Sequence, residues 1–268
     1  DVDDALQSGM TWVVDADLQG YFDSIPHDRL MSRVEERISD GRLLALLRAW
    51  LSQDIVSEMA CWSPTAGAPQ GAVISPLLAN IYLHPLDQEL TQRGYRMVRY
   101  ADDFVILCHS EREAHQALAH VRDWVAANGL ALHPDKTHVG DCRQSGQGFD
   151  FLGYRFEAGR RWVRRKSLQA FKDRVRRHTR RTQGQSLRMV IAVLNRMLRG
   201  WFAYFRHADR MTFRRLDSFI RRRLRALLRK QEKRPGRGIT LSDNQRWPNT
   251  FFATAGLFTL TDAWRLAS

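Results

Sequence analysis

The chain has 268 residues, 44% of them hydrophobic, which is enough to bury a core in one large domain or two small ones. No apolar run approaches the roughly 20 residues of a membrane-spanning helix, and the start at Asp1 is acidic, unlike a signal peptide, so we expect a cytoplasmic protein that meets no membrane. Cys61, Cys108 and Cys142 are widely spaced and odd in number, which predicts reduced, structural thiols rather than disulfides or a zinc site.

The net charge of +13 is unevenly distributed along the chain. Residues 1–157 carry 13 Lys and Arg against 23 Asp and Glu, a balance of −10, whereas residues 158–268 carry 29 against 6, a balance of +23. An acidic part can hold divalent cations, and a basic part can hold a phosphate backbone. A disordered tail would lack large apolar residues, which are frequent over 187–205, so we expect a folded basic domain.

The first predicted elements are a strand and two helices. Residues 11–14 are β-branched and aromatic and predict a strand that ends in an acidic loop. Helical periodicity follows over 27–38 and 42–51, with Asp28 as a candidate cap. The composition of 67–71, rich in glycine and proline, predicts a loop.

A helix and a hairpin come next. Ser75-Pro76 predicts a helix start, because proline at the first helical position loses no hydrogen bond, and the helix should run to Leu90. The strand-like runs 96–100 and 104–108 are separated by Ala101-Asp102-Asp103, which predicts a tight hairpin with two carboxylates at its tip.

The pattern then returns to a helix followed by strands. Ser110 with Glu113 predicts a capping box that opens a helix over 111–128, and Gly129 provides the stop. Residues 130–132 and 149–156 read as further strands. This order predicts an α+β fold with an antiparallel sheet and helices on one face.

Beyond Arg160 the pattern is helical. Three helices are predicted at 167–181, 186–208 and 211–231, and apolar residues at three- and four-residue spacing give the second one a single apolar stripe. A Pro- and Gly-rich linker over 233–238 precedes an apolar segment over 247–266, which we expect to fold back on this basic helical bundle.

Three carboxylates lie at strand ends of the expected sheet: Asp17, Asp102 and Asp103. Nucleotidyl transfer uses two Mg²⁺ ions about 4 Å apart, one activating a primer 3′-hydroxyl and one holding a triphosphate, and both prefer oxygen ligands. An Asp-Asp pair alone is weak evidence, because most such pairs only form solvated turns. The neighbouring motifs make the prediction specific.

Five motifs, in order, resemble those of reverse transcriptases, and in particular of proteins encoded by bacterial group II introns. They are Asp15 to Asp23, Gly67 to Asn80, the YADD box at Tyr100 to Asp103, Gly129 to Thr137, and Phe151 to Tyr154. The basic half resembles the family's thumb, or maturase-specific region, through residues 200–205 and 246–258. The resemblance implies a polymerase palm over 1–157, an all-α thumb over 158–235, and a segment over 236–268 that packs on the thumb.

The resemblance assigns the metal site. Asp17, Asp102 and Asp103 are implied as catalytic ligands of two Mg²⁺ ions, with Mn²⁺ as a substitute and the backbone carbonyl of Leu18 as a further ligand. Asp15 competes with Asp17, because strand alternation places both on one face.

The resemblance also assigns nucleotide and primer contacts. Gln70 and Gly71 are implied to contact the nucleotide and template, and Lys136 either protonates the leaving pyrophosphate or only contacts a phosphate. A ring of Tyr21 or Phe22 would lie under the incoming sugar and exclude a 2′-hydroxyl, and the spacing after the first catalytic aspartate favours Phe22. The implied primer grip consists of Phe151, Leu152, Gly153 and Tyr154.

The thumb is implied to hold nucleic acid through its arginines. The candidates are Arg176, Arg177, Arg180, Arg181, Arg221, Arg222 and Arg223, each of which alone also fits a general electrostatic role. Trp201, Phe202 and Tyr204 are more typical of a core than of a base-stacking surface.

The function implied is an RNA-directed DNA polymerase that copies group II intron RNA from a DNA primer with dNTPs, acts at a DNA target site and assists splicing. Two alternatives stay open: an RNA-binding splicing factor without polymerase activity, and a reverse transcriptase of another lineage, such as a defence-associated one. The chain begins without methionine, and we expect the family's N-terminal fingers and its zinc-finger endonuclease to be missing from it, which leaves polymerisation by this chain alone open.

Overall fold

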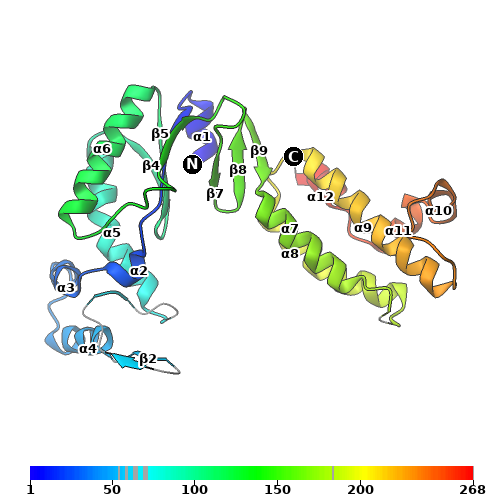
Figure 1. The fold of residues 1–268 in the computed structure, drawn as a ribbon, viewed down its shortest axis with the longest axis horizontal. Coiled ribbons are helices and arrows are strands. Elements are labelled where there is room, and N and C mark those ends of the chain that lie inside the picture. The colour runs from blue at the N-terminus through cyan, green and yellow to red at the C-terminus, as the bar shows by residue number, and fades with distance from the viewer. Residues whose placement is uncertain (54, 58–59, 63–65, 69–71, 183, 268) are drawn as a thin grey trace. The chain divides into compact units, whose positions relative to one another are not determined.

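The fold is taken from a computed structural model, which describes residues 1–53, 55–57, 60–62, 66–68, 72–182 and 184–267. The chain forms two compact units, Asp1–Phe151 and Leu152–Ser268, called unit 1 and unit 2 (Figure 1).

The described elements of unit 1 alternate between helices and strands. They are α1 (Val2–Gln7), β1 (Trp12–Ala16), α2 (Tyr21–Ser24), α3 (His27–Glu35), α4 (Gly41–Leu51), β2 (Ile55–Ser57), β3 (Ala60–Trp62), α5 (Ser75–Gln92), β4 (Arg96–Tyr100), β5 (Asp103–Cys108), α6 (Glu111–Ala127), β6 (His138–Asp141) and β7 (Phe149–Phe151).

The centre of unit 1 is a four-stranded antiparallel sheet in the order β4-β5-β1-β6. Val14 and Ala16 of β1 and Phe104 and Ile106 of β5 are buried in one core with residues of α5 and α6, which lie on the same side of the strands (Figure 1). α1 packs against β5, whose last five residues are all buried. The expected antiparallel sheet with helices packed on a face is confirmed.

Side-chain caps open two helices of unit 1, of which only the one at Ser110 was predicted. Asp40 caps α4 by accepting hydrogen bonds from the backbone N–H groups of Arg42 and Leu43. Ser110 caps α6 through the N–H of Glu113, but the Glu113 carboxylate accepts from His109 rather than from Ser110. The prediction of Asp28 as a cap is wrong, because α3 begins directly after Pro26 and Asp28 lies in its first turn.

The strands after α6 differ most from the sequence prediction. Residues 130–132 form no strand, only an isolated bridge between Leu132 and Leu18. The run 149–156 is divided into β7 and a later strand by Leu152 and Gly153, both at positive φ. β6 was not predicted, because its short sequence has no alternating pattern and it forms by pairing with β1.

Unit 2 begins with a hairpin and continues as helices. Its elements are β8 (Tyr154–Glu157), β9 (Arg160–Val163), α7 (Arg165–His178), α8 (Leu187–Phe205), α9 (Arg210–Gln231), α10 (Leu241–Arg246), α11 (Asn249–Thr254) and α12 (Leu260–Ala267). The three long helices agree with the predicted ranges to within a few residues. One detail is wrong: the region expected to be all-α contains β9, which pairs with β8.

The predicted apolar stripe of α8 forms the core of unit 2. Val190, Ile191, Leu194 and Leu198 are buried together with residues of α7, α9 and the C-terminal helices. α12 packs against α9, so the C-terminal segment does fold back on the helical bundle.

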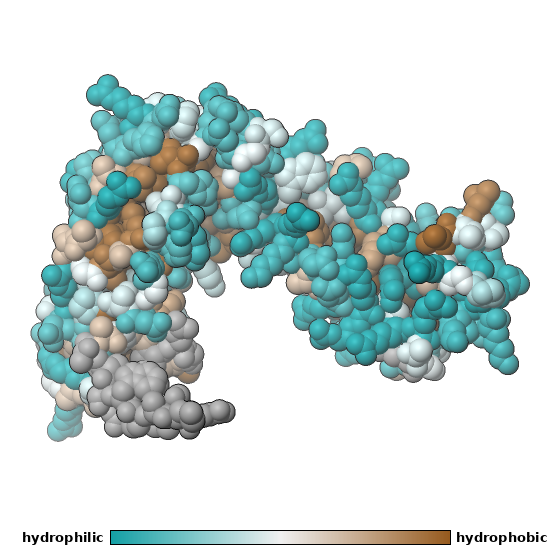
Figure 2. Space-filling view, viewed as in Figure 1, coloured by the Kyte–Doolittle hydropathy of each residue, from teal (hydrophilic) through white to brown (hydrophobic). Residues whose placement is uncertain are grey.

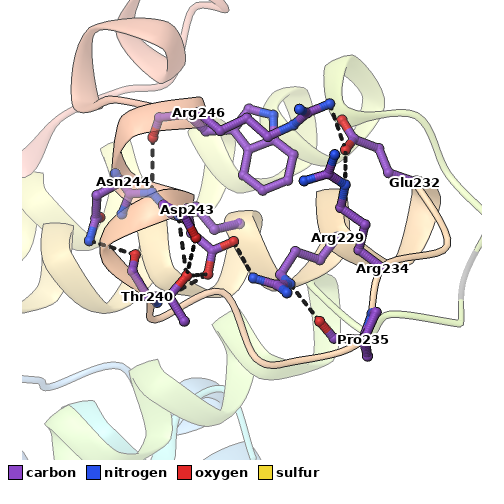
Figure 3. Close-up of polar contacts among 11 residues, drawn as sticks. Arg229, Glu232, Arg234, Pro235, Thr240, Asp243, Asn244 and Arg246 are labelled. Atoms are coloured by element: carbon purple, nitrogen blue, oxygen red, sulfur yellow. Dashed lines mark hydrogen bonds and ion pairs between the residues drawn. The ribbon is translucent and has the colours of Figure 1, made fainter.

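Buried polar contacts fasten the C-terminal helices to α9. Arg229 of α9 donates to Asp243 (2.5 Å), whose carboxylate also accepts from Thr240 in a capping box (Figure 3). Arg225 donates to the carbonyl of Trp247 (2.9 Å). Asp217 accepts from the first N–H groups of the α12 region, because those groups have no partner within their own helix.

The two described free cysteines agree with the expected structural role. Cys108 and Cys142 are buried, and burial raises the pKa of the Cys108 thiol to about 12, which keeps it protonated and unreactive. The side chain of Cys61 lies outside the described residues. Among the helices described, none is long and apolar enough to cross a bilayer.

Candidate active site

The predicted carboxylates converge at one end of the four-stranded sheet. β1 and β5 pair with Ala16 opposite Phe104, so the next residue, Asp17, comes opposite Asp103. Across the neighbouring hairpin Tyr100 pairs with Asp103, which leaves Ala101 and Asp102 as the turn. Opposite residues of antiparallel strands are separated by about 4.5–5.5 Å, so the register places Asp17 beside the hairpin tip.

Arg99 holds the hairpin tip in place. Its guanidinium donates to the carbonyl of Ala101 (2.8 Å), to Asn80 Oδ1 (2.8 Å) and, through Nε, to Asp87 Oδ1 (2.7 Å). Asn80 and Asp87 lie on α5, and the Arg99 side chain is only 12% exposed. The brace keeps Ala101 in the left-handed conformation (φ 57°), which non-glycine residues adopt at a cost. Sequence reasoning missed this role, because the partners are brought together only by packing.

Lys136 lies directly at the site. Its Nζ donates to Asp17 Oδ2 at 2.8 Å, and the carbonyl of Asp17 accepts from the N–H of His133 (2.8 Å), which fastens the Lys136 segment to the end of β1. The side chains of Asp17 and Lys136 are 36% and 60% exposed. Within the described ranges no group of three or more His, Cys, Asp or Glu side chains is arranged to hold a metal, and the positive charge beside Asp17 is that of Lys136.

Asp15 occupies a different environment from Asp17. Its side chain is 17% exposed, with His138 Nε2 at 3.8 Å. Burial raises the pKa of Asp15 to about 6, and the carboxylates of Asp103, Asp150 and Asp17 add to the rise while His138 opposes it. Several carboxylates therefore share this end of the sheet, and Asp17 is the more accessible of the two β1 candidates.

Tyr21 and Phe22 have distinct surroundings. Tyr21 is 2% exposed, and its hydroxyl donates to the carbonyl of Ala79 (2.6 Å), so it is a core residue. Phe22 is partly buried and packs against the core, and its carbonyl accepts from the N–H of Ala68 (2.6 Å).

The loop before Gln70 is fastened to the segment that carries Phe22. The N–H of Gly67 donates to Ile25 (2.8 Å), and the Gly67 carbonyl lies 2.6 Å from His27 Nε2. A Cβ at Gly67 (φ +95°) would stand 2.9 Å from backbone atoms of Phe22 and Asp23, so only glycine allows this approach. Gln70 and Gly71 lie outside the described residues.

The residues predicted as a primer grip form a tight turn. Phe151 is buried at the end of unit 1. In unit 2, Leu152 and Gly153 have positive φ, and the Tyr154 hydroxyl donates to the carbonyl of Tyr204 (2.6 Å). Tyr204 in turn donates to the carbonyl of Leu152 (3.0 Å), a reciprocal contact that the sequence did not indicate.

The predicted thumb arginines are mostly exposed. Arg176, Arg177, Arg180, Arg181 and Arg222 are exposed, and Arg221 and Arg223 are partly exposed. Some also have contacts within unit 2: Arg176 pairs with Asp173 (2.5 Å), Arg223 donates to the carbonyl of Thr179 (2.9 Å) at the end of α7, and the Arg222 guanidinium lies 5.6 Å from the centre of the Phe219 ring. Hydrophilic residues cover most of the face of unit 2 seen in Figure 2. Trp201 and Phe202 pack against the core of unit 2, which confirms the core interpretation for both.

Residues 3–156, which hold the whole carboxylate site, match the family described as reverse transcriptase (RNA-dependent DNA polymerase). The chain belongs to the reverse transcriptase family. Residues 168–244 match the group II intron maturase-specific domain, so this reverse transcriptase combines a polymerase domain with a maturase domain. Members of the family use divalent metal ions and act on nucleic acids, and the two domains together imply RNA binding.

Similar proteins include intron-encoded ones. The chain is 37% identical over 84 residues to the group II intron-encoded protein LtrA of Lactococcus lactis subsp. cremoris, covering 31% of this chain and 14% of LtrA. It is 27% identical over 248 residues to the putative COX1/OXI3 intron 2 protein of Saccharomyces cerevisiae, covering 69% of this chain and 29% of that protein. This reverse transcriptase thus spans less than a third of either relative.

A solved structure shares the fold. Telomerase from Candida albicans, solved with a fragment of telomeric RNA, aligns with a TM-score of 0.52 over 96% of this chain and 52% of that chain. The sequence identity is 13%, so this likeness concerns the fold alone.

Proposed function

We propose that the chain is the polymerase and thumb region of a group II intron reverse transcriptase, which copies intron RNA into DNA from a DNA primer and assists splicing of the same RNA. One observation supports the proposal: the β1-β5 register ends with Ala16 opposite Phe104, so Asp17 directly follows β1 at the end of the sheet where Asp103 begins β5 and Asp102 lies in the adjoining turn. Accessible carboxylates on neighbouring strands are the arrangement that two-metal nucleotidyl transfer requires.

The donor set fits Mg²⁺, with Mn²⁺ as a substitute. Asp17, Asp102 and Asp103 offer hard oxygen ligands, and the carbonyl of Leu18 is a further candidate. Burial raises the pKa of Asp15 and the carboxylates of Asp103, Asp150 and Asp17 add to the rise, so several negative charges share this end of the sheet, where the Lys136 ammonium group pairs with Asp17. Bound metal would lower the pKa of the primer 3′-hydroxyl and neutralise the triphosphate.

The remaining residues position the substrates. Phe22 is our candidate for the ring under the sugar of the incoming dNTP, since Tyr21 is buried with its hydroxyl bonded. Lys136 lies within 2.8 Å of Asp17, near enough to donate a proton to departing pyrophosphate or to contact a phosphate. Gln70 and Gly71 would contact nucleotide and template from the loop that Gly67 fastens to the Phe22 segment.

The thumb and primer grip would hold the duplex. Tyr154 and Leu152 are braced by Tyr204, which gives the Phe151 to Tyr154 turn a fixed shape for contacting a primer. The exposed arginines of unit 2 would contact phosphates of the intron RNA, the template and the DNA target.

The test is primer extension by the chain and by a form joined to a fingers region of its family. We expect Asp102→Ala with Asp103→Ala to abolish cDNA synthesis, because the metal ions would lose two of their three proposed carboxylate ligands, while RNA affinity stays largely unchanged. The matched control is Asp123→Ala, which removes an exposed carboxylate on α6 and should leave synthesis intact. Undiminished synthesis by the double variant would refute the metal assignment, and wild-type protein that promotes splicing without extending a primer would favour the splicing factor without polymerase activity.

A further inference from the structure

Unit 2 contains a cavity of about 350 Å³ that the proposed polymerase reaction does not use. Its walls come from β9, α7 and α9, and β9 leads directly into α7 (Figure 1). The α9 wall is one helix face, since most of its residues follow three- and four-residue spacing from Thr212 to Arg222. The volume falls at the lower end of the roughly 300–1,000 Å³ of small-ligand pockets.

The inner wall of the cavity is apolar and aromatic. Val163, Leu216 and Phe219 are buried, and Trp162 is partly exposed. Thr212 adds a hydroxyl to the wall. Two aromatic side chains in a cavity of this size provide apolar surface for a flat ring.

The rim of the cavity is cationic. Lys172, Arg215 and Arg222 line it, and in the part of unit 2 that the structure describes no carboxylate pairs with them. The positive potential extends beyond the rim to Arg223. Burial lowers the pKa of Arg223, and the neighbouring Arg176, Arg222 and Arg181 lower it further.

The acidic residues of this region all have partners elsewhere. Five pair with arginines, namely Glu157, Asp173, Glu232, Asp243 and Asp262, and two cap helices, namely Asp209 and Asp217. The positive rim is therefore left for a ligand from outside the chain.

We propose that this cavity, the Trp162 pocket, binds one unstacked nucleotide of an RNA strand, with its base against Trp162 and Phe219 and its phosphates at Lys172, Arg215 and Arg222. Aromatic rings between cationic groups are the combination that holds single-stranded nucleic acid, since every base has a face to stack. A base within a duplex cannot enter, because its faces are covered by its neighbours. The inference rests on the proposed function for its RNA partner.

The experiment measures binding of the full chain to labelled single-stranded RNA of about ten nucleotides and to the same sequence as a duplex. We expect Trp162→Ala to weaken binding of single-stranded RNA by about 5–100-fold through lost stacking, with duplex binding unchanged. Because stacking releases no counterions, the salt dependence of the remaining binding should not change. Trp162→Phe should retain most of the affinity.

Matched controls separate the pocket from general effects. Phe251→Ala removes an exposed aromatic ring of α11 outside the pocket and should have no effect. Arg222→Gln should lower the slope of affinity against salt by about one, more than Arg188→Gln, which removes an exposed charge at the start of α8. Thermal unfolding of each variant verifies that it is folded.

Two results of the direct binding assay would overturn the proposal: the same affinity of Trp162→Ala and wild type for single-stranded RNA, or an equal loss of affinity for duplex and single strand in a folded variant. Two competition results would also overturn it. Displacement of the RNA by AMP that depends on Trp162 would make a free nucleotide the ligand, and displacement by an acidic peptide as efficient as by unlabelled RNA would make the site a general anion site. The binding assay needs no polymerisation. Failure of primer extension would therefore refute the polymerase proposal while leaving a Trp162-dependent preference for single strands standing.

Discussion

Units 1 and 2 carry opposite net charge, and in each unit side chains of the less frequent charge, called the minority charge, have a structural role. Unit 1 has 12 Lys and Arg against 22 Asp and Glu, and unit 2 has 30 against 7. In unit 1 the partly buried Arg99 braces the hairpin tip, and in unit 2 the buried Asp217 and Asp243 fasten the C-terminal helices to α9. In both units a side chain of the rarer charge is wholly or partly buried and holds segments of the fold together.

The majority charge gathers at the proposed functional surfaces. In unit 1 the carboxylates of Asp103, Asp150 and Asp17 add to the burial that raises the pKa of Asp15, and in unit 2 the neighbouring arginines add to the burial that lowers the pKa of Arg223. Like charges in proximity cost stability, so such clusters are typical of sites that an oppositely charged ligand completes. The comparison predicts that the two kinds of charge respond differently to mutation.

The largest expected effect is the salt dependence of RNA binding by the Lys and Arg side chains of unit 2. If binding engages some 6–10 phosphates, RNA affinity should fall by about 10³–10⁵ between 50 and 200 mM salt, because each neutralised phosphate releases counterions. Equilibrium binding across that salt range measures the slope. A flat response would mean that the basic unit is not the nucleic-acid surface.

Arg99, a minority charge of unit 1, should determine the position of the carboxylate turn. Arg99→Leu removes the donors to Ala101, Asn80 and Asp87, and a displaced carboxylate turn should lower the rate of cDNA synthesis by about 100-fold. Primer extension at saturating dNTP measures the rate. Arg93→Leu is the control, since its ion pair with Glu89 is exposed on the same helix region; equal rates for both variants would show that the brace is dispensable.

Asp217, a minority charge of unit 2, should contribute to the free energy of unfolding. Asp217→Ala removes the acceptor of the N–H groups of Leu260 and Thr261, and leaving them unpaired should cost about 1–3 kcal/mol of unfolding free energy. Urea unfolding measures the loss. The salt slope of RNA binding should stay the same, whereas a changed slope would place Asp217 in the binding surface.

A further expected effect, confined to a narrow pH range, is a pH dependence of stability at Asp15. Its folded pKa of about 6 exceeds the ordinary 3.8, so the folded state takes up a proton between these values, and the resulting stability is present below about pH 4 and lost as the pH rises through 6. In EDTA, Asp15→Asn should therefore gain stability over the wild type as pH rises from about 4 to 7, by about 1–3 kcal/mol. Unfolding curves at both ends of the range measure this gain, and a difference that does not vary with pH would contradict the buried carboxylate.

Much of the fold and the candidate residues followed from the sequence alone. The cap at Ser110, the proline after Ser75 and the stripe of α8 act through neighbours within one or two helical turns, so their residue types suffice to predict them. The YADD turn and the division of charge at about residue 157 were likewise visible in the order of residues.

The tertiary structure decided everything that depends on distant partners. Three features join segments that are far apart in sequence: the β1-β5 register that ends beside Asp17, the pairing of β6 with β1, and the brace at Arg99. The burial of Tyr21 in place of Phe22 was equally invisible, because both rings have the same local propensity. Local preferences are set by a residue's own neighbourhood, whereas register and burial are set by packing of the whole core, which no short stretch of sequence encodes.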